Sequence, residues 1–307
     1  MKKNVGGYLL RGLLYAAGSL PLGVHRFNAR IIAFLSRYVI RYRLGVVRDN
    51  LTHAFPDKSK AEIRALENDF YKHFADLIVE TVWFGACRDP RRLRKAGIVR
   101  IANPEVINSL YEKAPGVVSL YSHCGNWELL GGIGNYSDVP TCFTEENTCF
   151  VYREMKNKAW DEAMRYNRCA PVDPETFPGY IETEQLVRYV FSHRGEKKLY
   201  NINTDQRPYF YSPANIKVMF MGRVCKTMTG GAALARKFRM AVCYLGMRRL
   251  PGGKYEMVHI PICEDASKME VGDIMKRYYE LLEADIKADP ANYLWTHKRW
   301  KWNYNMD

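Results

Sequence analysis

The chain has 307 residues, and its 46 Lys and Arg residues exceed its 33 Asp and Glu residues, which gives a formal net charge of +13. With 47% hydrophobic and 26% charged residues, the composition excludes a disordered chain, a collagen-like chain and a multi-span membrane protein. The length suits one large domain or two small ones. The basic excess calls for an acidic partner, which is a nucleic acid, an anionic membrane, or a negatively charged substrate or carrier.

Residues 1–48 form a basic and apolar N-terminal segment that contains no acidic residue. Their nine basic side chains are Lys2, Lys3, Arg11, Arg26, Arg30, Arg37, Arg41, Arg43 and Arg48. Charge mixed with apolar and aromatic residues favours an anionic membrane surface over DNA, although a solvated helix face has the same composition.

The longest uncharged run of this segment, Gly12 to Val24, has 13 residues. That is short of the about 20 residues that a spanning helix needs, and Pro21 would kink or end a helix there. We therefore expect residues 1–48 to be a helical anchor that lies in the membrane plane or inserts shallowly. A short single span, with Arg11 reaching the interface, is the alternative.

Helical signals dominate the chain up to about residue 110. Ser59 and Glu62 form a capping-box pattern, and the apolar periodicity that follows predicts a helix to about Phe84. Asp89-Pro90 and the basic residues after it read as a connector.

From Pro115 onward, strand-like runs alternate with helical stretches, which indicates an α/β core with a largely parallel sheet. The expected helices cover residues 127–133, 158–167, 181–192, 229–238 and 271–288. The expected strands cover residues 117–121, 148–152, 198–203, 217–222, 240–247 and 254–261, the last two joined by a turn at residues 250–253. We expect an α/β domain over residues 49–307, preceded by the anchor.

The eight cysteines show no CxxC pair and no Cys/His cluster with zinc spacing, so we expect no metal site and a reducing compartment.

The sharpest chemical feature is the segment Ser122-His-Cys-Gly-Asn-Trp-Glu128. An apolar strand runs into His123, Gly125 and Asn126 permit a tight turn, and Asn126 can cap the following helix. Across such a turn Glu128 can reach one ring nitrogen of His123, which leaves the other nitrogen as a general base. A second HxxxxE match, His259 to Glu264, has neither a glycine turn nor a helix start, so we interpret it as structural.

The segment at His123 resembles the HxxxxD/E block of glycerolipid acyltransferases, and more narrowly the "HFGNWE" form of the bacterial lipid A biosynthesis (lauroyl/myristoyl) acyltransferases. Further blocks resemble that family in the same order along the chain. They are Arg41–Leu51 with Ala54–Pro56, Val151–Arg153 with Lys156-Asn157, Asn203–Gln206, Phe220–Gly222 with Thr229–Arg236, and Tyr293–Lys301.

The resemblance implies a glycerolipid-acyltransferase-like central sheet flanked by helices. It also implies that His123 deprotonates a hydroxyl of a lipid A precursor, which then attacks an acyl thioester without a covalent acyl-enzyme. Glu128 would orient His123, and Arg153 would bind the developing oxyanion or a substrate phosphate. The resemblance also implies that Asp205 contacts either a residue of the site or a substrate hydroxyl. Asn126 and Gln206 would be further substrate-binding residues.

The same residues also have purely structural interpretations. Arg153 is also compatible with a solvated strand end, and Asp205-Gln206 with an ordinary turn. Cys124 replaces the family's Phe, and Arg207 follows Asp-Gln where an acidic or small residue is more usual, which bears on acyl-chain or acceptor preference. A nucleophilic Cys124 is disfavoured, because adjacent side chains of an extended segment point to opposite sides. The aromatic and basic tail reads as an interfacial belt or a structural clamp rather than a nucleic-acid platform.

The resulting prediction is an O-acyltransferase on the cytoplasmic face of a bacterial inner membrane. Its expected partners are acyl carrier protein or coenzyme A thioesters, a phosphorylated glycolipid acceptor and an anionic membrane surface, with no cofactor, metal or nucleic acid. The alternatives are an acyltransferase with another lipid acceptor (a glycerolipid, a phosphoinositol mannoside or an aminolipid) and a non-enzymatic basic membrane-binding protein.

Overall fold

The computed structural model describes residues 5–137, 139–208 and 216–300. Its centre is a seven-stranded sheet with the order β1-β9-β8-β2-β5-β3-β4, and a separate two-stranded ribbon pairs β6 with β7. All neighbours in the large sheet are parallel except β8 and β9, which form an antiparallel pair. The strands are β1 (Val99–Ile101), β2 (Val117–Tyr121), β3 (Thr148–Tyr152), β4 (Tyr180–Glu182), β5 (Leu199–Asn203), β6 (Lys217–Phe220), β7 (Arg223–Lys226), β8 (Ala241–Leu250) and β9 (Lys254–Cys263).

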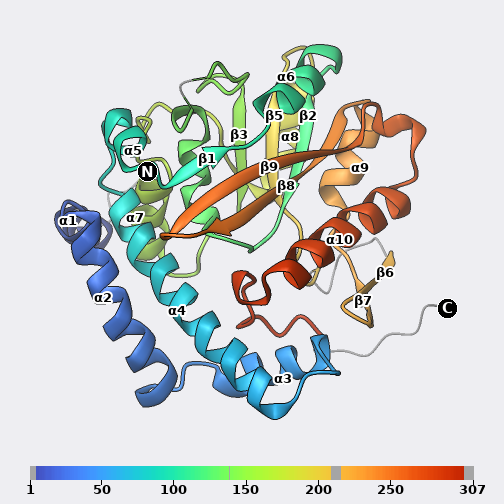
Figure 1. The fold of residues 1–307 in the computed structure, drawn as a ribbon. Coiled ribbons are helices and arrows are strands. Elements are labelled where there is room, and N and C mark those ends of the chain that lie inside the picture. The colour runs from blue at the N-terminus through green and yellow to red at the C-terminus, as the bar shows by residue number, and fades with distance from the viewer. Residues whose placement is uncertain (1–4, 138, 209–215, 301–307) are drawn as a thin grey trace.

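Helices cover both faces of this sheet (Figure 1). The α-helices are α1 (Val5–Gly18), α2 (Leu22–Phe34), α3 (Leu44–Ala54), α4 (Lys60–Phe84), α5 (Pro90–Ala96), α6 (Pro104–Lys113), α7 (Lys158–Arg168), α8 (Leu186–Ser192), α9 (Gly230–Lys237) and α10 (Val271–Ala288). A π-helical turn, η1 (Leu35–Val39), continues α2, and the 3-10 segments are η2 (Trp127–Asn135), η3 (Thr183–Gln185), η4 (Ala266–Lys268) and η5 (Pro290–Asn292).

The predicted α/β class is confirmed, with a mostly parallel sheet flanked by helices and preceded by N-terminal helices. The capping box at α4 forms as expected, because the Ser59 side chain accepts from the Glu62 backbone and Glu62 reaches back to the Ser59 backbone N–H at 2.8 Å. Pro21 separates α1 from α2, which agrees with its predicted effect on a helix.

The short edge strands β1 and β4 were not predicted, nor was the ribbon strand β7. Ile181 and Glu182 begin the helix expected over residues 181–192, but together with Tyr180 they pair with β3 before the chain turns into η3 and α8. Three residues are too few to show an alternation of apolar and polar side chains, so edge pairing decides their conformation. The predicted connector after Asp89 is instead the helix α5, whose first turn the Asp89 side chain caps.

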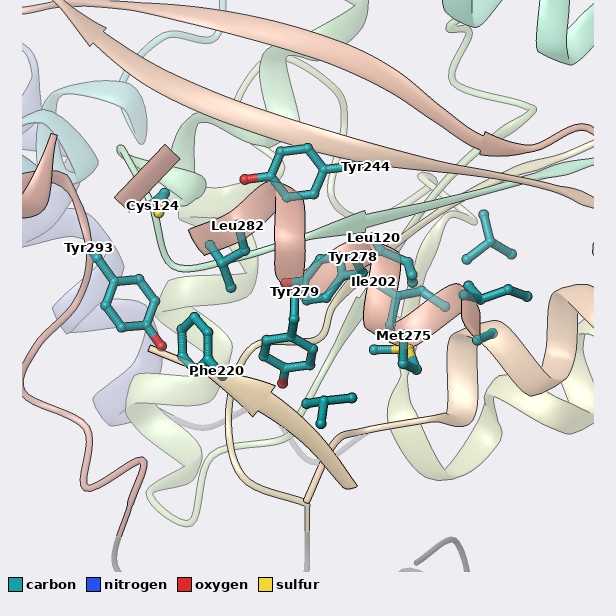
Figure 2. Packing of buried hydrophobic residues seen from close by; sticks show 14 of the residues in the cluster. Leu120, Cys124, Ile202, Phe220, Tyr244, Met275, Tyr278, Tyr279, Leu282 and Tyr293 are labelled. Carbon is teal, nitrogen blue, oxygen red and sulfur yellow. The ribbon is translucent and has the colours of Figure 1, made fainter. Parts of the chain in front are cut away.

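Alternate strand residues bury against the helices on opposite faces, which is the pattern of a sheet covered on both sides. On one face Leu120, Ile202 and Tyr244 pack against the α10 residues Met275, Tyr278, Tyr279 and Leu282 (Figure 2). On the other face Val117, Leu199 and Cys243 pack beneath α6 and η2. The central strands β2, β5 and β8 are therefore held rigidly, and so are the residues that follow β2 and β5.

Candidate active site

Two strand ends bring His123 and Asp205 together. Strands β2 and β5 are parallel neighbours, and their register pairs Tyr121 with Asn203. Because both chains continue past the same edge of the sheet, the residue two positions beyond each strand, His123 or Asp205, faces the other. The Nδ1 atom of His123 lies 2.8 Å from Oδ1 of Asp205, and the His123 backbone N–H donates to the same oxygen at 3.3 Å.

The Asp205 carboxylate is 1% exposed, whereas the side chain of His123 is 16% exposed. Burial alone raises the pKa of Asp205, but the facing His123, through its charge and its hydrogen bond, outweighs burial and lowers the pKa below its ordinary value. An ionised Asp205 can only accept a hydrogen bond, so the His123 nitrogen that faces it is the protonated Nδ1–H. The Nε2 atom then carries the lone pair that a general base needs.

Amide groups surround the free edge of the His123 ring. The Gln206 Nε2 lies 3.1 Å from His123 Nε2, and the Asn203 Nδ2 lies 3.4 Å from it. The Trp127 ring stands edge-on to the imidazole, with ring centroids 4.6 Å apart. These contacts fix the ring plane while leaving Nε2 on the side of a cavity.

That cavity has a volume of about 320 Å³ and is open to the protein surface. Its polar wall includes His123, Glu128, Arg153, Arg168, Gln206 and Arg207. Its apolar wall includes Leu130, Phe150, Val151, Leu186, Ile202 and Met228. A base at the boundary between cationic and apolar walls fits a substrate that has a charged head and a hydrocarbon chain.

Glu128 does not take the place expected for it beside the imidazole, and the carboxylate that holds His123 is Asp205. Glu128 forms a two-pronged ion pair with Arg168 of α7, with distances of 2.6 Å from Nε to Oε2 and 2.7 Å from Nη2 to Oε1. The Trp127 indole also donates to it at 3.2 Å. Burial raises the pKa of Glu128, but Arg168 more than compensates and the net pKa is lowered. The residues after Asn126 form the 3-10 helix η2, which directs Glu128 towards α7.

Asn126 does not cap η2, contrary to the prediction, and it is fully buried away from the cavity wall. Its Nδ2 donates to the Glu80 carboxylate at 3.0 Å and to the Leu77 carbonyl at 3.3 Å, so the side chain joins the turn to α4. A buried amide must satisfy its donors, and α4 supplies the acceptors.

Two more of the predicted site residues line the cavity, and two residues that were interpreted as non-catalytic are buried. Arg153 is exposed at the end of β3 and lines the cavity, as does Gln206. Cys124 is 1% exposed and burial raises the pKa of its thiol well above the ordinary value, so it is not poised as a nucleophile. His259 is buried and its pKa is lowered to about 4 by burial, which suits its structural interpretation.

Within the described residues, the aromatic and basic tail (Trp295–Trp300) is a buried clamp and not an interfacial belt. Trp295 is fully buried, and Arg299 and Trp300 are 2% and 9% exposed. Lys301 and Trp302 lie outside the described residues. Arg168 was not singled out from the sequence; nothing in its local pattern distinguishes it from the neighbouring Arg165.

A titratable carboxyl lies directly behind the turn at residues 123–126. Glu80 is 1% exposed and accepts hydrogen bonds from Asn126 and from the Tyr255 hydroxyl, the latter at 2.8 Å. Burial raises the pKa of Glu80 to about 7, against an ordinary value of 4.5, although the two hydrogen bonds oppose the shift. The folded protein therefore binds the proton more tightly than the unfolded chain does between these two pH values.

This shift predicts a loss of stability as the pH rises. Because the folded pKa is the higher one, the free energy of unfolding should fall by about 1–3 kcal/mol between pH 5 and pH 8 through Glu80 alone. Glu80→Gln keeps an acceptor for both partners and removes the charge, so its stability should not show this fall. Urea unfolding across this pH range measures the difference; parallel pH profiles for the two proteins would contradict the assignment.

The α/β fold and a cavity with one apolar and one cationic wall are compatible with an enzyme that acts on lipid substrates. The chain matches the family model described as bacterial lipid A biosynthesis acyltransferase over residues 2–163 and 196–302, and it belongs to that family. It is thus an O-acyltransferase that uses an acyl thioester donor and a lipid acceptor. No curated protein matches the chain.

Proposed function

We propose that the protein transfers a fatty acyl chain from acyl carrier protein to a hydroxyl of a lipid A precursor, with His123 as the general base. The observation that carries this proposal is the 2.8 Å contact of His123 with the buried Asp205 at the wall of the cavity. Asp205 selects the Nδ1–H tautomer and stabilises the imidazolium that forms during the reaction.

In this mechanism the acceptor hydroxyl attacks the thioester directly, so no covalent acyl-enzyme forms. The acceptor hydroxyl displaces the Gln206 amide from His123 Nε2 and gives its proton to that nitrogen. The oxygen attacks the thioester carbonyl and forms a tetrahedral oxyanion. When the carbon–sulfur bond breaks, the thiolate takes the proton from the imidazolium, and an ester and a free thiol remain.

Two arginines supply positive charge on the same cavity wall. Glu128 holds Arg168 in a fixed plane, and Arg168 also donates to the Tyr180 hydroxyl at 3.0 Å. In this proposal Glu128 acts through Arg168, which stabilises the oxyanion, and Arg153 at the open rim contacts a phosphate of the acceptor. The role assigned to Glu128 thus differs from the direct orientation of His123 predicted from the sequence.

The acceptor is tested by product analysis with purified protein. Acyl carrier protein thioester is supplied with a lipid A precursor, and in parallel with a lysoglycerolipid or a phosphoinositol mannoside. Acylation of the lipid A precursor alone supports the proposal, whereas preferential acylation of another acceptor would replace it. Replacing the carrier-protein thioester by its coenzyme A analogue identifies the donor.

The N-terminal helices support a peripheral attachment to the cytoplasmic face of the bacterial inner membrane. Helix α2 packs on α4 through Ala29, which contacts Ala75 and Val79, while its other face exposes large apolar side chains. This exposed stripe comprises Val24, Phe27, Ile31, Phe34 and Tyr38, at 41–62% exposure. In the described part of the chain, each helix is either too short or too polar to cross a bilayer.

We expect the exposed stripe to bind anionic vesicles. Replacing Phe27, Ile31 and Phe34 together by Ser should weaken binding at least about 10-fold, because each inserted side chain contributes about 1 kcal/mol or more. Co-sedimentation with phosphatidylglycerol vesicles measures this. The matched control replaces Val187, Phe191 and Met219 by Ser, which are equally exposed (53–62%) but lie outside the N-terminal helices. Equal binding by both triple variants would exclude α2 as the attachment site.

A further inference from the structure

The C-terminal segment Asn292–Arg299 passes directly behind residues 123–126, which we call the catalytic turn. Tyr293 forms an isolated antiparallel bridge with Cys124, and the Leu294 backbone N–H donates to the His123 carbonyl at 3.0 Å. Figure 2 shows Tyr293 and Cys124 on the same side of the core formed by α10 and the sheet. The main chain of His123 is therefore held by a segment that lies about 170 residues further along the sequence.

The side chain of Asn292 makes the most specific contact in this region. Its Oδ1 accepts from the Gly125 backbone N–H at 3.0 Å, and its Nδ2 donates to the Met247 carbonyl of β8 at 2.8 Å. The same Gly125 N–H also lies 3.0 Å from the Asn292 carbonyl oxygen. Asn292 is 2% exposed, so no solvent competes for these bonds.

The turn that Asn292 holds has little freedom to move. Gly125 has a φ of +64°, a conformation that favours glycine, and a Cβ atom there would lie 2.5 Å from Cγ of Met247. The Asn126 backbone N–H contacts the Met247 sulfur at 3.1 Å. The amide of Asn292 thus ties the turn and β8 together at the point where the two pack most closely.

We propose that Asn292 is a positioning residue for acyl transfer, because its amide fixes the turn that carries His123 opposite Asp205. The inference rests on the proposed role of His123 as the base. Without the amide, Gly125 keeps only its backbone partner and the Met247 carbonyl loses a donor. The His123 ring then samples positions in which Nδ1 no longer meets Asp205.

The segment is held from the other side by Asn50 of α3. Its Nδ2 donates to the carbonyls of Trp295 and His297 at 2.8 and 2.9 Å, and Asn50 is 5% exposed. Asn50 contacts neither the catalytic turn nor the cavity wall. It therefore offers a second and independent way to loosen the same segment.

The experiment compares Asn292→Ala and Asn50→Ala with Asn103→Ala. Asn103 is the matched control, because its amide likewise bridges backbone groups, donating to the His259 carbonyl at 2.8 Å and accepting from the His259 N–H at 2.9 Å, far from the turn. Rates are measured well below the unfolding temperature of each variant and normalised to the folded fraction. The readouts are kcat, KM for donor and acceptor, and the pH dependence of kcat/KM.

We expect kcat of Asn292→Ala to fall about 10- to 100-fold with both KM values within about twofold. Asn50→Ala should show a smaller loss of the same kind, and Asn103→Ala should keep its kcat. The pH profile of kcat/KM should also change in Asn292→Ala, because Nδ1 of His123 no longer meets Asp205. A loss of folded protein does not change the shape of that profile.

An unshifted pH profile together with a kcat equal to that of Asn103→Ala would overturn the inference. Its failure is separable from failure of the proposed function. If His123→Ala retains acyl transfer, the function fails; if His123→Ala is inactive while Asn292→Ala behaves as the control, only the positioning role of Asn292 fails.

Discussion

His123→Ala should abolish measurable acyl transfer while leaving the protein folded. The side chain is 16% exposed and lines the cavity, so its removal enlarges an existing opening and the thermal unfolding temperature should fall only modestly. Loss of a general base costs about 10²- to 10⁴-fold in rate. The buried Asp205 still accepts from the backbone N–H of residue 123 in this variant. Rates with a carrier-protein thioester and a lipid acceptor measure the effect.

The matched control for this variant is His53→Ala. His53 lies on α3, where its side chain is 42% exposed and pairs with Asp49 of its own helix. Its removal should leave the rate unchanged. Full activity in His123→Ala would disprove the proposed mechanism, whatever the other residues do.

Asp205→Asn should be the second most damaging single change, at about 10²- to 10⁴-fold in kcat. Asparagine has nearly the same shape, but it is neutral and cannot stabilise the imidazolium. It also no longer enforces the Nδ1–H tautomer of His123. The loss should appear in kcat at saturating concentrations of both substrates, because substrate binding does not depend on this buried carboxylate.

A buried carboxylate outside the cavity serves as the control for Asp205→Asn. Asp285 is 7% exposed and accepts from Tyr244 and Arg248, each at 2.8 Å. Asp285→Asn should lower the stability of the protein but preserve kcat. If Glu128→Gln lost the pH dependence of the base and Asp205→Asn did not, the acid that orients His123 would be Glu128 after all.

The sequence allowed the strand that leads into His123, the turn at Gly125 and the helix that begins at Ser59 to be predicted, because each depends on residues that are adjacent or one helical turn apart. The partner of His123 could not be predicted with the same certainty. Asp205 lies 82 positions further along, and its approach requires that β5 pair with β2 in one particular register. A spacing motif carries no information about which strands become neighbours.

The same limit explains the different surroundings of Glu128. Its distance of five residues from His123 suggested a contact across the turn, yet a long-range partner, Arg168, competes for the carboxylate and offers two hydrogen bonds. Likewise, the Asn126 side chain was expected to cap the following helix, but it donates instead to two acceptors of α4. At both positions a tertiary contact with better geometry outweighed the local preference.

The positions of the basic residues say more about their partners than the net charge of +13 does. Part of the basic excess lies in N-terminal helices that expose apolar side chains, and part lines the cavity that holds His123. These two sites suit two different anions, the membrane surface and the phosphorylated substrate. The composition alone could not separate them.

The most direct test is the mass spectrum of lipid A from cells that contain or lack the protein. The cells without it are then complemented by the wild type or by His123→Ala. If the protein acylates a lipid A precursor through His123, lipid A should lose the mass of one acyl chain when the protein is absent, and only the wild type should restore it. Identical lipid A spectra with and without the protein, or restoration by His123→Ala, would contradict the proposed function.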